Sequence, residues 1–267
     1  MTDPAPLRWT DPGPDRSLIL TLASNSTRNA LSKELFAALE VGVSQAEAAA
    51  REDRIDAVLL RAEGRAFCAG FDLAESAAEG RTLVEFVERL SALVRRLRDL
   101  DAIVVASVQG PALAGGCALV AAADIVIASM SATFGYPVHR IGVSPAVSLP
   151  TLLASAGIGG ARLLALGGET VTAERALALG FVHRVVPDEH TLRVEEVATL
   201  AGLAAKGRIA LRETQRWLNR VDGTSRHGAL GSRSDEAARA TADLCAGEEA
   251  RSMLAAVWAA RHGAPRA

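Results

Sequence analysis

The sequence has few aromatic residues and little net charge. Aromatic side chains make up 4% of its 267 residues, so we expect an interior packed mainly with small and aliphatic side chains. The formal net charge is −2, which gives no electrostatic reason to expect nucleic acid or an anionic membrane as a partner. The length suits one large α/β domain, or one domain with an appendage.

Cysteine is also scarce, and the three that are present lie at Cys68, Cys117 and Cys245. Their number is odd and their spacing is not that of a metal site, so we expect reduced thiols, no metal and a cytoplasmic location. No histidine lies near Cys68 or Cys117 in the sequence to activate them, which favours small buried side chains over nucleophiles. The N-terminal segment has no apolar region of the kind that a secretion signal needs.

Long apolar runs are scarce as well, and one run is a candidate for a membrane-spanning segment. Ala102 to Ala123 carries no charged residue and is long enough to span a bilayer. Gly110-Pro111 and Gly115-Gly116 interrupt it, and a broken segment in lipid would leave backbone groups without hydrogen bonds. We therefore predict no membrane span. The chain also lacks a G-x-S-x-G motif, which argues against a serine hydrolase.

The most informative stretch runs from Ile103 to Ala128. It begins with β-branched residues, turns at Gly110-Pro111, passes Gly115-Gly116 and continues into an alanine-rich segment, a pattern that predicts strand, turn, helix and strand. The first N–H groups of a helix have no intrahelical partner, and glycine allows another group to approach them closely. This turn can hold an anion or a developing oxyanion, although the same glycines also suit a tight, closely packed turn.

A second segment, RAFCAGFDL at residues 65–73, sharpens this interpretation. The two segments resemble the "AFCAGxDL" and "GxALGGG" segments of the crotonase (enoyl-CoA hydratase/isomerase) family, and the resemblance extends from about Leu18 to Val186. It implies an α/β fold with a crotonase-like ββα spiral core and a C-terminal helical oligomerisation region. It also implies an acyl-CoA thioester ligand, whose oxygen is held by the backbone N–H groups of Phe71 and Gly115. It does not specify a reaction.

The resemblance further implies contacts with CoA at Arg28, Ala30, Ala69, Asp72 and Leu73. Arg28 belongs to an RNALS turn that lies against CoA in the family, where an arginine can neutralise a phosphate. A solvent-exposed loop arginine is the alternative. Asp72 is interpreted first as the cap of the following helix, with a contact to CoA-facing backbone or a chemical role as alternatives.

The sequence departs from the family pattern at the positions that carry acids. Family hydratases use two glutamates, and the matching positions here are Ala118 and Val138. The carboxylate position of related isomerases and of chlorobenzoyl-CoA dehalogenase is Ala146 here. An oxyanion hole stabilises charge but carries no proton, whereas general acid–base transfer typically adds about 10²–10⁴-fold in rate. We therefore expect slow hydration by the two-glutamate route.

Other groups are candidates to replace these acids. His139 directly follows the lost glutamate and is our candidate acid–base residue, unless it points away, as neighbouring side chains do on an extended chain. Glu85 and Glu88 lie on a helix expected over 81–100, where solvent-facing side chains fit better. Tyr136 is a further polar group, for which a structural role is favoured. Asp72, a substrate carboxylate or bound bicarbonate are other possible bases.

The rest of the pattern predicts three regions: a flexible arm over residues 1–16, a spiral core over 17–193 and a C-terminal helical region over 194–267. The expected elements are strands at 17–22 and 55–61, helices that begin after Ser32 and Thr172, a helix over 81–100, helical pieces over 149–166, and C-terminal helices at 194–205, 209–221 and 235–260. A segment rich in glycine and serine, 223–234, is expected to be mobile.

Two functions remain open at this point. The first is an enzyme that stabilises a thioester enolate and uses unusual acid–base groups. The second is a non-catalytic acyl-CoA binding or delivery protein, which the three missing acids suggest. The resemblance implies a homotrimer or a dimer of trimers, and no cofactor apart from the CoA thioester itself as substrate or ligand.

Overall fold

The fold is known from a computed structural model, which describes residues 5–78, 81–225 and 228–262. Its centre is a six-stranded sheet in the order β1-β2-β3-β4-β6-β9, in which β1 pairs antiparallel and all other pairs are parallel. A smaller sheet has the order β5-β7-β8. The strands are β1 Leu7–Trp9, β2 Ser17–Leu22, β3 Ala57–Ala62, β4 Ile103–Val108, β5 Ala112–Leu113, β6 Ile125–Ser129, β7 Thr133–Gly135, β8 Thr170–Thr172 and β9 Arg184–Val186. The predicted α/β class is confirmed.

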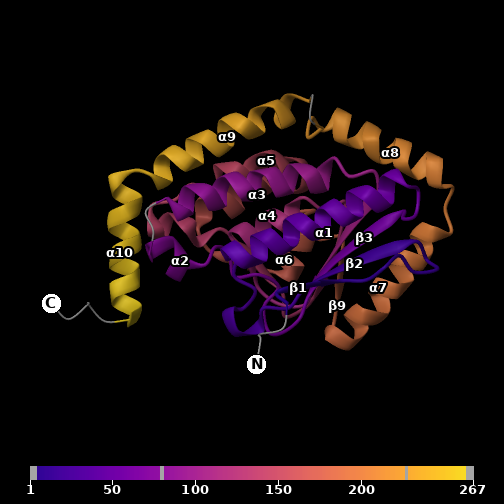
Figure 1. The fold of residues 1–267 in the computed structure, drawn as a ribbon, viewed down its shortest axis with the longest axis horizontal. Coiled ribbons are helices and arrows are strands. Elements are labelled where there is room, and N and C mark those ends of the chain that lie inside the picture. The colour runs from indigo at the N-terminus through magenta and orange to yellow at the C-terminus, as the bar shows by residue number, and fades with distance from the viewer. Residues whose placement is uncertain (1–4, 79–80, 226–227, 263–267) are drawn as a thin grey trace.

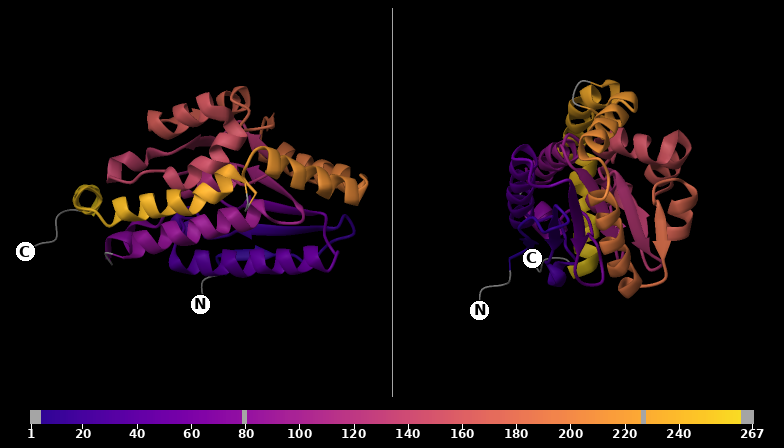
Figure 2. Two further views of the ribbon diagram at one scale, coloured as in Figure 1. Left: turned by 90° about the horizontal axis from the view of Figure 1, so that it is seen from above. Right: turned by 90° about the vertical axis from the view of Figure 1, so that its right-hand side faces the viewer.

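Helices surround the sheet and extend beyond it at the C-terminal end. Figure 1 shows α1 and α3 running across the sheet, α8 and α9 along one side of the molecule, and α10 turning down beside α2; Figure 2 shows the same layers from two other sides. The α-helices are α1 Lys33–Arg51, α2 Leu73–Ala78, α3 Thr82–Arg98, α4 Gly115–Ala121, α5 Leu149–Gly167, α6 Ala173–Ala178, α7 Glu189–Ala204, α8 Arg208–Val221, α9 Ala229–Cys245 and α10 Glu248–His262. The short 3₁₀ helices are η1 Asn25–Thr27, η2 Pro137–Ile141 and η3 Ala146–Ser148.

The central strand β4 is buried on both faces, which explains why all of its residues except Ser107 are apolar. Val104 and Ala106 belong to the main core, whereas Ile103 and Val105 pack in a second cluster with Leu192 and other residues of α7. A strand with helices on both sides has no solvent-facing positions, so alternation of apolar and polar residues is not needed there. The sheet is therefore a rigid support for the turn that follows β4.

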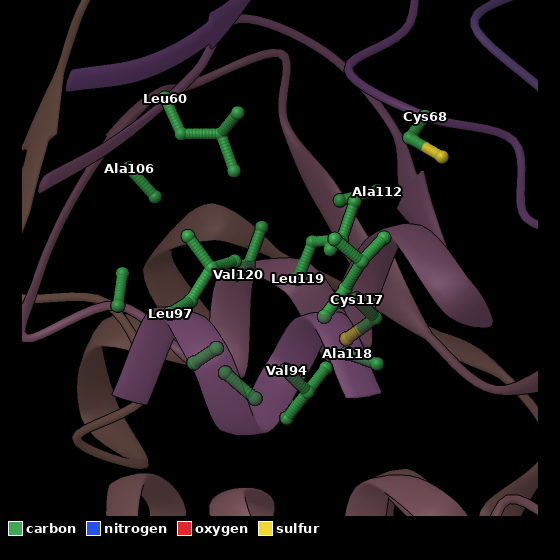
Figure 3. Packing of buried hydrophobic residues seen from close by; sticks show 14 of the residues in the cluster. Leu60, Cys68, Val94, Leu97, Ala106, Ala112, Cys117, Ala118, Leu119 and Val120 are labelled. Atoms are coloured by element: carbon green, nitrogen blue, oxygen red, sulfur yellow. The ribbon is translucent and has the colours of Figure 1, made fainter. Parts of the chain in front are cut away.

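The main core is built from small and aliphatic side chains, as the low aromatic content predicts. Figure 3 shows Leu60 of β3 and Ala106 of β4 near Val120 of α4 and Leu97 of α3. The apolar stripe expected on α3 is confirmed, because its seven residues are all buried: Leu83, Phe86, Val87, Leu90, Leu93, Val94 and Leu97. The small side chains of α4 allow this helix to lie close to the sheet.

Two predicted helix caps are confirmed. The Ser32 Oγ accepts a hydrogen bond from the Leu35 N–H at 3.1 Å, and the Thr172 Oγ1 accepts one from the Arg175 N–H at 3.2 Å. Each cap satisfies one of the N–H groups that the first helical turn leaves unpaired, a contribution of about 1 kcal/mol.

The C-terminal helices are joined to the sheet by buried charge. Glu196 of α7 is 2% exposed, and its carboxylate accepts hydrogen bonds from the Ser107 hydroxyl at 2.5 Å, from Arg61 at 3.2 Å and from Arg193. A buried carboxylate is stable only when its oxygens are paired in this way. These bonds position α7 against β3 and β4. The boundary expected between the spiral core and the C-terminal helical region, at residues 193 and 194, falls inside helix α7.

Three expectations from the sequence need correction. The arm over residues 1–16 is not flexible throughout, because Leu7 is buried and Leu7–Trp9 pair with β2; residues 1–4 lie outside the described part. The single helix expected over 235–260 is two helices that separate at Ala246-Gly247, where glycine weakens helix continuation. The segment 223–234, expected to be mobile, contains the first turns of α9, although residues 226–227 are not described.

The apolar run from Ala102 to Ala123 forms β4, β5 and α4 in the core, as expected for a stretch that does not span a membrane. Within the described residues, one helical stretch is long and apolar enough to cross a bilayer. It is Ala146–Gly167, with 22 residues, a mean hydropathy of 1.4 and 44% of its most apolar window buried. Gly157 interrupts it with φ 64° and ψ 171°, and part of it packs in the core, so this evidence for a span is weak.

Candidate functional site

The two segments singled out in the sequence lie against each other. Cys68 pairs with Ala112 as an isolated parallel bridge, and the Leu113 N–H donates to the Cys68 carbonyl oxygen at 2.9 Å. Gly116 is pressed onto the same residue, because a Cβ added there would lie 2.5 Å from the Cys68 carbonyl oxygen. Only glycine fits at this contact without movement of the backbone. Gly116 is therefore required for the close approach of the two segments.

This contact brings Phe71 towards the start of α4. Gly70 has a φ of +89°, and a Cβ added to it would lie 3.7 Å from the Gly115 amide nitrogen and 3.0 Å from the Ala114 Cβ. The bridge between Leu31 and Phe71 holds the other side of the same turn. Within the described part of the chain, neither the Phe71 N–H nor the Gly115 N–H donates a hydrogen bond. Two unpaired backbone donors thus come from neighbouring turns.

Ala114, which precedes the second donor, has a strained backbone. Its φ of 50° and ψ of −115° lie outside the regions that L-residues favour. The family motif has a glycine at the position that Ala114 occupies in this chain. Such a conformation costs about 1–3 kcal/mol and persists only where the surroundings enforce it. Here the Ala114 N–H donates to the Gly135 carbonyl oxygen at 2.9 Å, and α4 begins at the next residue. The strain determines the direction of the Gly115 N–H.

Both donor residues line one cavity of about 630 Å³. Its wall combines the turn before α1, the two donor segments, η2, η3 and the last two helices. The volume is in the range of small-molecule sites, and most of the side chains on the wall are apolar. All five residues that the resemblance assigns to CoA also lie on this wall: Arg28, Ala30, Ala69, Asp72 and Leu73.

Comparison with known proteins agrees with this geometry. The family model for enoyl-CoA hydratase/isomerase matches residues 17–232. The chain is 35% identical over 178 residues to the 2,3-dehydroadipyl-CoA hydratase of Escherichia coli (strain K12), which covers 66% of this chain and 68% of that protein. A probable enoyl-CoA hydratase of Rhodobacter capsulatus is 34% identical over 192 residues, 70% of this chain and 73% of its own.

A solved structure shows the same fold over nearly the whole chain. It is an enoyl-CoA hydratase/isomerase from Xanthobacter autotrophicus Py2, with a TM-score of 0.84, 27% identity, and coverage of 97% of this chain and 94% of that one. The chain belongs to the enoyl-CoA hydratase/isomerase family. The crotonase-like fold expected from the sequence is confirmed, including a helical C-terminal region.

Apart from Asp72, the described residues of the cavity wall include no carboxylate that could take the place of the missing family acids at positions 118, 138 and 146. Val138 lines the cavity, whereas Ala118 and Ala146 do not. Glu85 and Glu88 are exposed on α3 and lie off the cavity wall, which confirms their expected solvent-facing positions. Among the described residues of the wall, Asp72 is the one carboxylate. The Asp72 Oδ1 accepts hydrogen bonds from the Ala74 and Glu75 N–H groups at 2.8 and 3.2 Å, so it caps α2 as predicted.

The structure does not bring His139 to the cavity. The segment that contains it is the 3₁₀ helix η2, not the extended chain that we assumed, and residues three apart share a face of such a helix. The cavity wall includes Val138 with Ile141 and Pro137 with Arg140, while His139 is exposed between them. A role for His139 in proton transfer would therefore require η2 to rotate.

Sequence reasoning missed several residues of the wall. Ser144 comes from the turn after η2, Ser148 from η3, Thr241 from α9, and Val257 and Trp258 from α10. The helices α9 and α10 lie more than a hundred residues from the donor segments in the sequence, and no local pattern connects them with the site. The Arg140 guanidinium was also missed, although its segment resembles a family motif.

Tyr136 is a buried part of this site. It lies beside Ala114, because β5 and β7 pair Leu113 with Gly135 and the residues that follow these two are Ala114 and Tyr136. The side chain is 1% exposed, and its hydroxyl makes no hydrogen bond within the described residues, although it lies near Cys117 and Ser148. Burial raises the pKa of the Tyr136 phenol well above its usual value. Its hydroxyl is thus neutral at ordinary pH, and Tyr136 is among the residues that line the cavity.

The cysteines near the donors are inert. Cys68 and Cys117 are both fully buried, and burial raises the pKa of each thiol to about 12. A thiol with such a pKa has almost no thiolate at neutral pH, so neither is a nucleophile. The structure confirms the expectation of small buried side chains.

The burial of Tyr136 predicts how the protein responds to alkaline pH. Because the folded-state pKa is raised, ionisation costs no stability below the unfolded pKa of about 10, and stability falls as the pH rises above it. Tyr136 is the only tyrosine in the chain, so phenolate absorbance reports on this residue alone. We expect phenolate to appear only together with loss of the far-UV circular dichroism signal.

The matched variant is Tyr136→Phe, which removes the hydroxyl and keeps the ring. We expect it to unfold at higher pH than the unchanged protein and to be at least as stable at pH 7, since a buried hydroxyl without a partner costs about 1–3 kcal/mol. Phenolate that forms while the circular dichroism signal is still native would contradict the burial of this side chain.

Proposed function

We propose that the protein binds an acyl-CoA thioester in the cavity and stabilises its enolate. The thioester oxygen accepts hydrogen bonds from the Phe71 and Gly115 N–H groups, and negative charge develops on that oxygen when the enolate forms. The observation that supports this proposal is that both N–H groups lack a partner within the described chain and belong to one cavity wall. Removal of one such donor from an oxyanion hole typically costs about 10²–10³-fold in turnover.

The proton transfers differ from those of a two-glutamate hydratase. Ala118, Val138 and Ala146 carry no proton, and the Asp72 carboxylate is engaged as a helix cap. We therefore propose that the base is a group of the substrate or a bound bicarbonate, or that η2 rotates to bring His139 into the cavity. In each case addition of water to a simple enoyl-CoA such as crotonyl-CoA is slow, because no fixed pair of carboxylates holds the water.

A second candidate function is acyl-CoA binding or delivery without catalysis. The specific observation in its favour is that three carboxylate positions are apolar while the donor segments are intact. The two candidates share the ligand and differ in turnover.

A panel of CoA esters distinguishes them. We expect calorimetric binding of acyl-CoA at micromolar concentration, turnover of crotonyl-CoA at least about 10²-fold slower than is usual for family hydratases, and faster turnover of at least one other ester. Binding with no turnover across the panel supports the second candidate. Absence of binding for every ester contradicts both.

We further propose that the protein forms a homotrimer or a dimer of trimers in the cytoplasm. Support comes from the exposed apolar side chains of α8, which include Ile209, Trp217, Leu218 and Val221. A soluble monomer rarely exposes so many large apolar residues on one helix. Light scattering on the purified protein tests this: a mass near 27.8 kDa would contradict it.

A further inference from the structure

The cavity wall carries an imbalance of charge. Its charged residues within the described chain are Arg28, Asp72 and Arg140. The Asp72 carboxylate already accepts two hydrogen bonds from the first turn of α2. Neither arginine side chain has an ion pair or hydrogen bond within the described residues. Arginines elsewhere in the protein, such as Arg16, Arg89 and Arg98, form ion pairs with carboxylates. The described cavity wall therefore presents an excess of positive charge.

The two arginines lie on different parts of the wall. Arg28 belongs to the turn before α1, which we assign to CoA together with Ala69 and Asp72. Arg140 belongs to η2, whose residues Val138 and Ile141 also line the cavity. The resemblance places at Val138 a glutamate that acts on the acyl group, which implies that η2 lies on the acyl side of the cavity. Gly142, at the end of η2, packs directly against α10, since a Cβ there would lie 2.8 Å from the Ala250 Cα.

The loss of the motif glutamates changes which acyl groups this wall accepts. A glutamate at position 118 or 138 would repel an anionic acyl group in the cavity. With Ala118 and Val138 in place, that repulsion is absent, and Arg140 attracts an anion. The same substitutions that remove the proton carriers therefore make the acyl side suitable for a negative charge. Val138, Ile141 and Val257 add apolar side chains to the same wall, which suits the alkyl part of an acyl group.

We propose that the acyl group of the ligand carries a carboxylate and that the Arg140 guanidinium binds it. The ligand class is then a CoA thioester of a short dicarboxylic acid. A guanidinium matches a carboxylate with two parallel hydrogen bonds, which fixes the orientation of the acyl chain as well as its charge. This inference depends on the proposed binding of acyl-CoA in the same cavity.

Calorimetry with chain-matched esters tests the proposal. The pairs are glutaryl-CoA with valeryl-CoA and adipyl-CoA with hexanoyl-CoA, which differ within each pair in the terminal carboxylate. We expect at least one dicarboxylic ester to bind about tenfold more tightly than its alkyl counterpart at low salt, as is typical of a hydrogen-bonded charge pair at a partly desolvated site. The preference should decrease at high salt, because the site is open to solvent.

The test variant is Arg140→Gln, and the control is Arg162→Gln on an exposed face of α5 away from the cavity. We expect Arg140→Gln to abolish the preference and to leave the affinity for the alkyl ester within about twofold. Arg162→Gln should retain the preference, and thermal unfolding confirms that both variants are folded. Because Arg140 is exposed and unpaired in the described chain, its replacement should not affect the fold.

Equal affinities within each pair, or a preference that survives in Arg140→Gln, would overturn this inference while the alkyl esters still report binding in the cavity. If no CoA ester binds at all, the proposed function fails and the inference fails with it. The alkyl esters thus separate the two failures.

Discussion

Replacement of Gly115 with proline is expected to lower the turnover of any CoA ester that the protein processes by about 10²–10³-fold. Proline has no N–H, so one of the two proposed donors to the thioester oxygen is lost. Gly115 is the first residue of α4, a position where the φ of proline suits the helix. Binding of the ground-state thioester should weaken less, by about tenfold, because a neutral oxygen gains less from the hydrogen bond than an enolate does. Turnover is measured by assays of product formation, and binding of the thioester is measured by calorimetry.

The control for this variant is Gly115→Ala. A Cβ at this position would lie 2.7 Å from the Leu31 Cδ1 in either variant, and the alanine retains the N–H. The Leu31 methyl is the end of a flexible side chain, which can move at moderate cost. We expect Gly115→Ala to retain most of the activity and binding. Equal losses in the alanine and proline variants, with both folded by circular dichroism, would show that the N–H is not the group that matters.

Substitution of Gly116 with alanine should have the largest effect on stability. The added Cβ would lie 2.5 Å from the Cys68 carbonyl oxygen and 2.7 Å from the Cys68 Cβ, so backbone must move. Overpacking of this kind typically costs about 1–3 kcal/mol. The movement separates the segments that carry Phe71 and Gly115, so we also expect affinity for acyl-CoA to fall. Urea unfolding gives the change in the free energy of unfolding.

A matched substitution elsewhere isolates the effect of this contact. Gly202 lies in α7 with nothing within 4 Å of its added Cβ, and it is exposed. Gly202→Ala should stabilise the protein by about 0.5–1 kcal/mol, because alanine loses less backbone entropy in a helix. A Gly116→Ala variant that is as stable as Gly202→Ala would refute the close approach of Gly116 to Cys68.

The donor segments illustrate how far local sequence could reach. The β-branched run before Gly110, the start of a helix after the glycine pair at 115–116 and the capping carboxylate of Asp72 depend on residues a few positions away, and each was placed correctly. The same holds for the caps Ser32 and Thr172. The resemblance in two short segments then predicted the fold. These segments are specific because their close backbone contacts require glycine, as at Gly70 and Gly116.

Other parts of the site could not be predicted, since they depend on packing between distant elements. The strand β1 has three residues and few signals of its own, and it exists because Leu7 is buried against the sheet. His139 was a candidate because it follows the position of the lost glutamate, and the 3₁₀ form of η2 places Arg140 on the cavity wall and leaves His139 off it. Trp258 reaches the same wall because α10 turns back at Gly247.

The sequence by itself determined the family, the strand and helix types of the core, and the absence of carboxylates at three positions, because these depend on residue identity and on neighbours along the chain. Only the tertiary structure decided which side chains share the cavity, and that Tyr136 is buried and Arg140 exposed with no hydrogen-bond or ion-pair partner among the described residues. The physical reason is that solvent exposure and charge pairing arise between elements that meet in space. Local periodicity contains no information about that meeting.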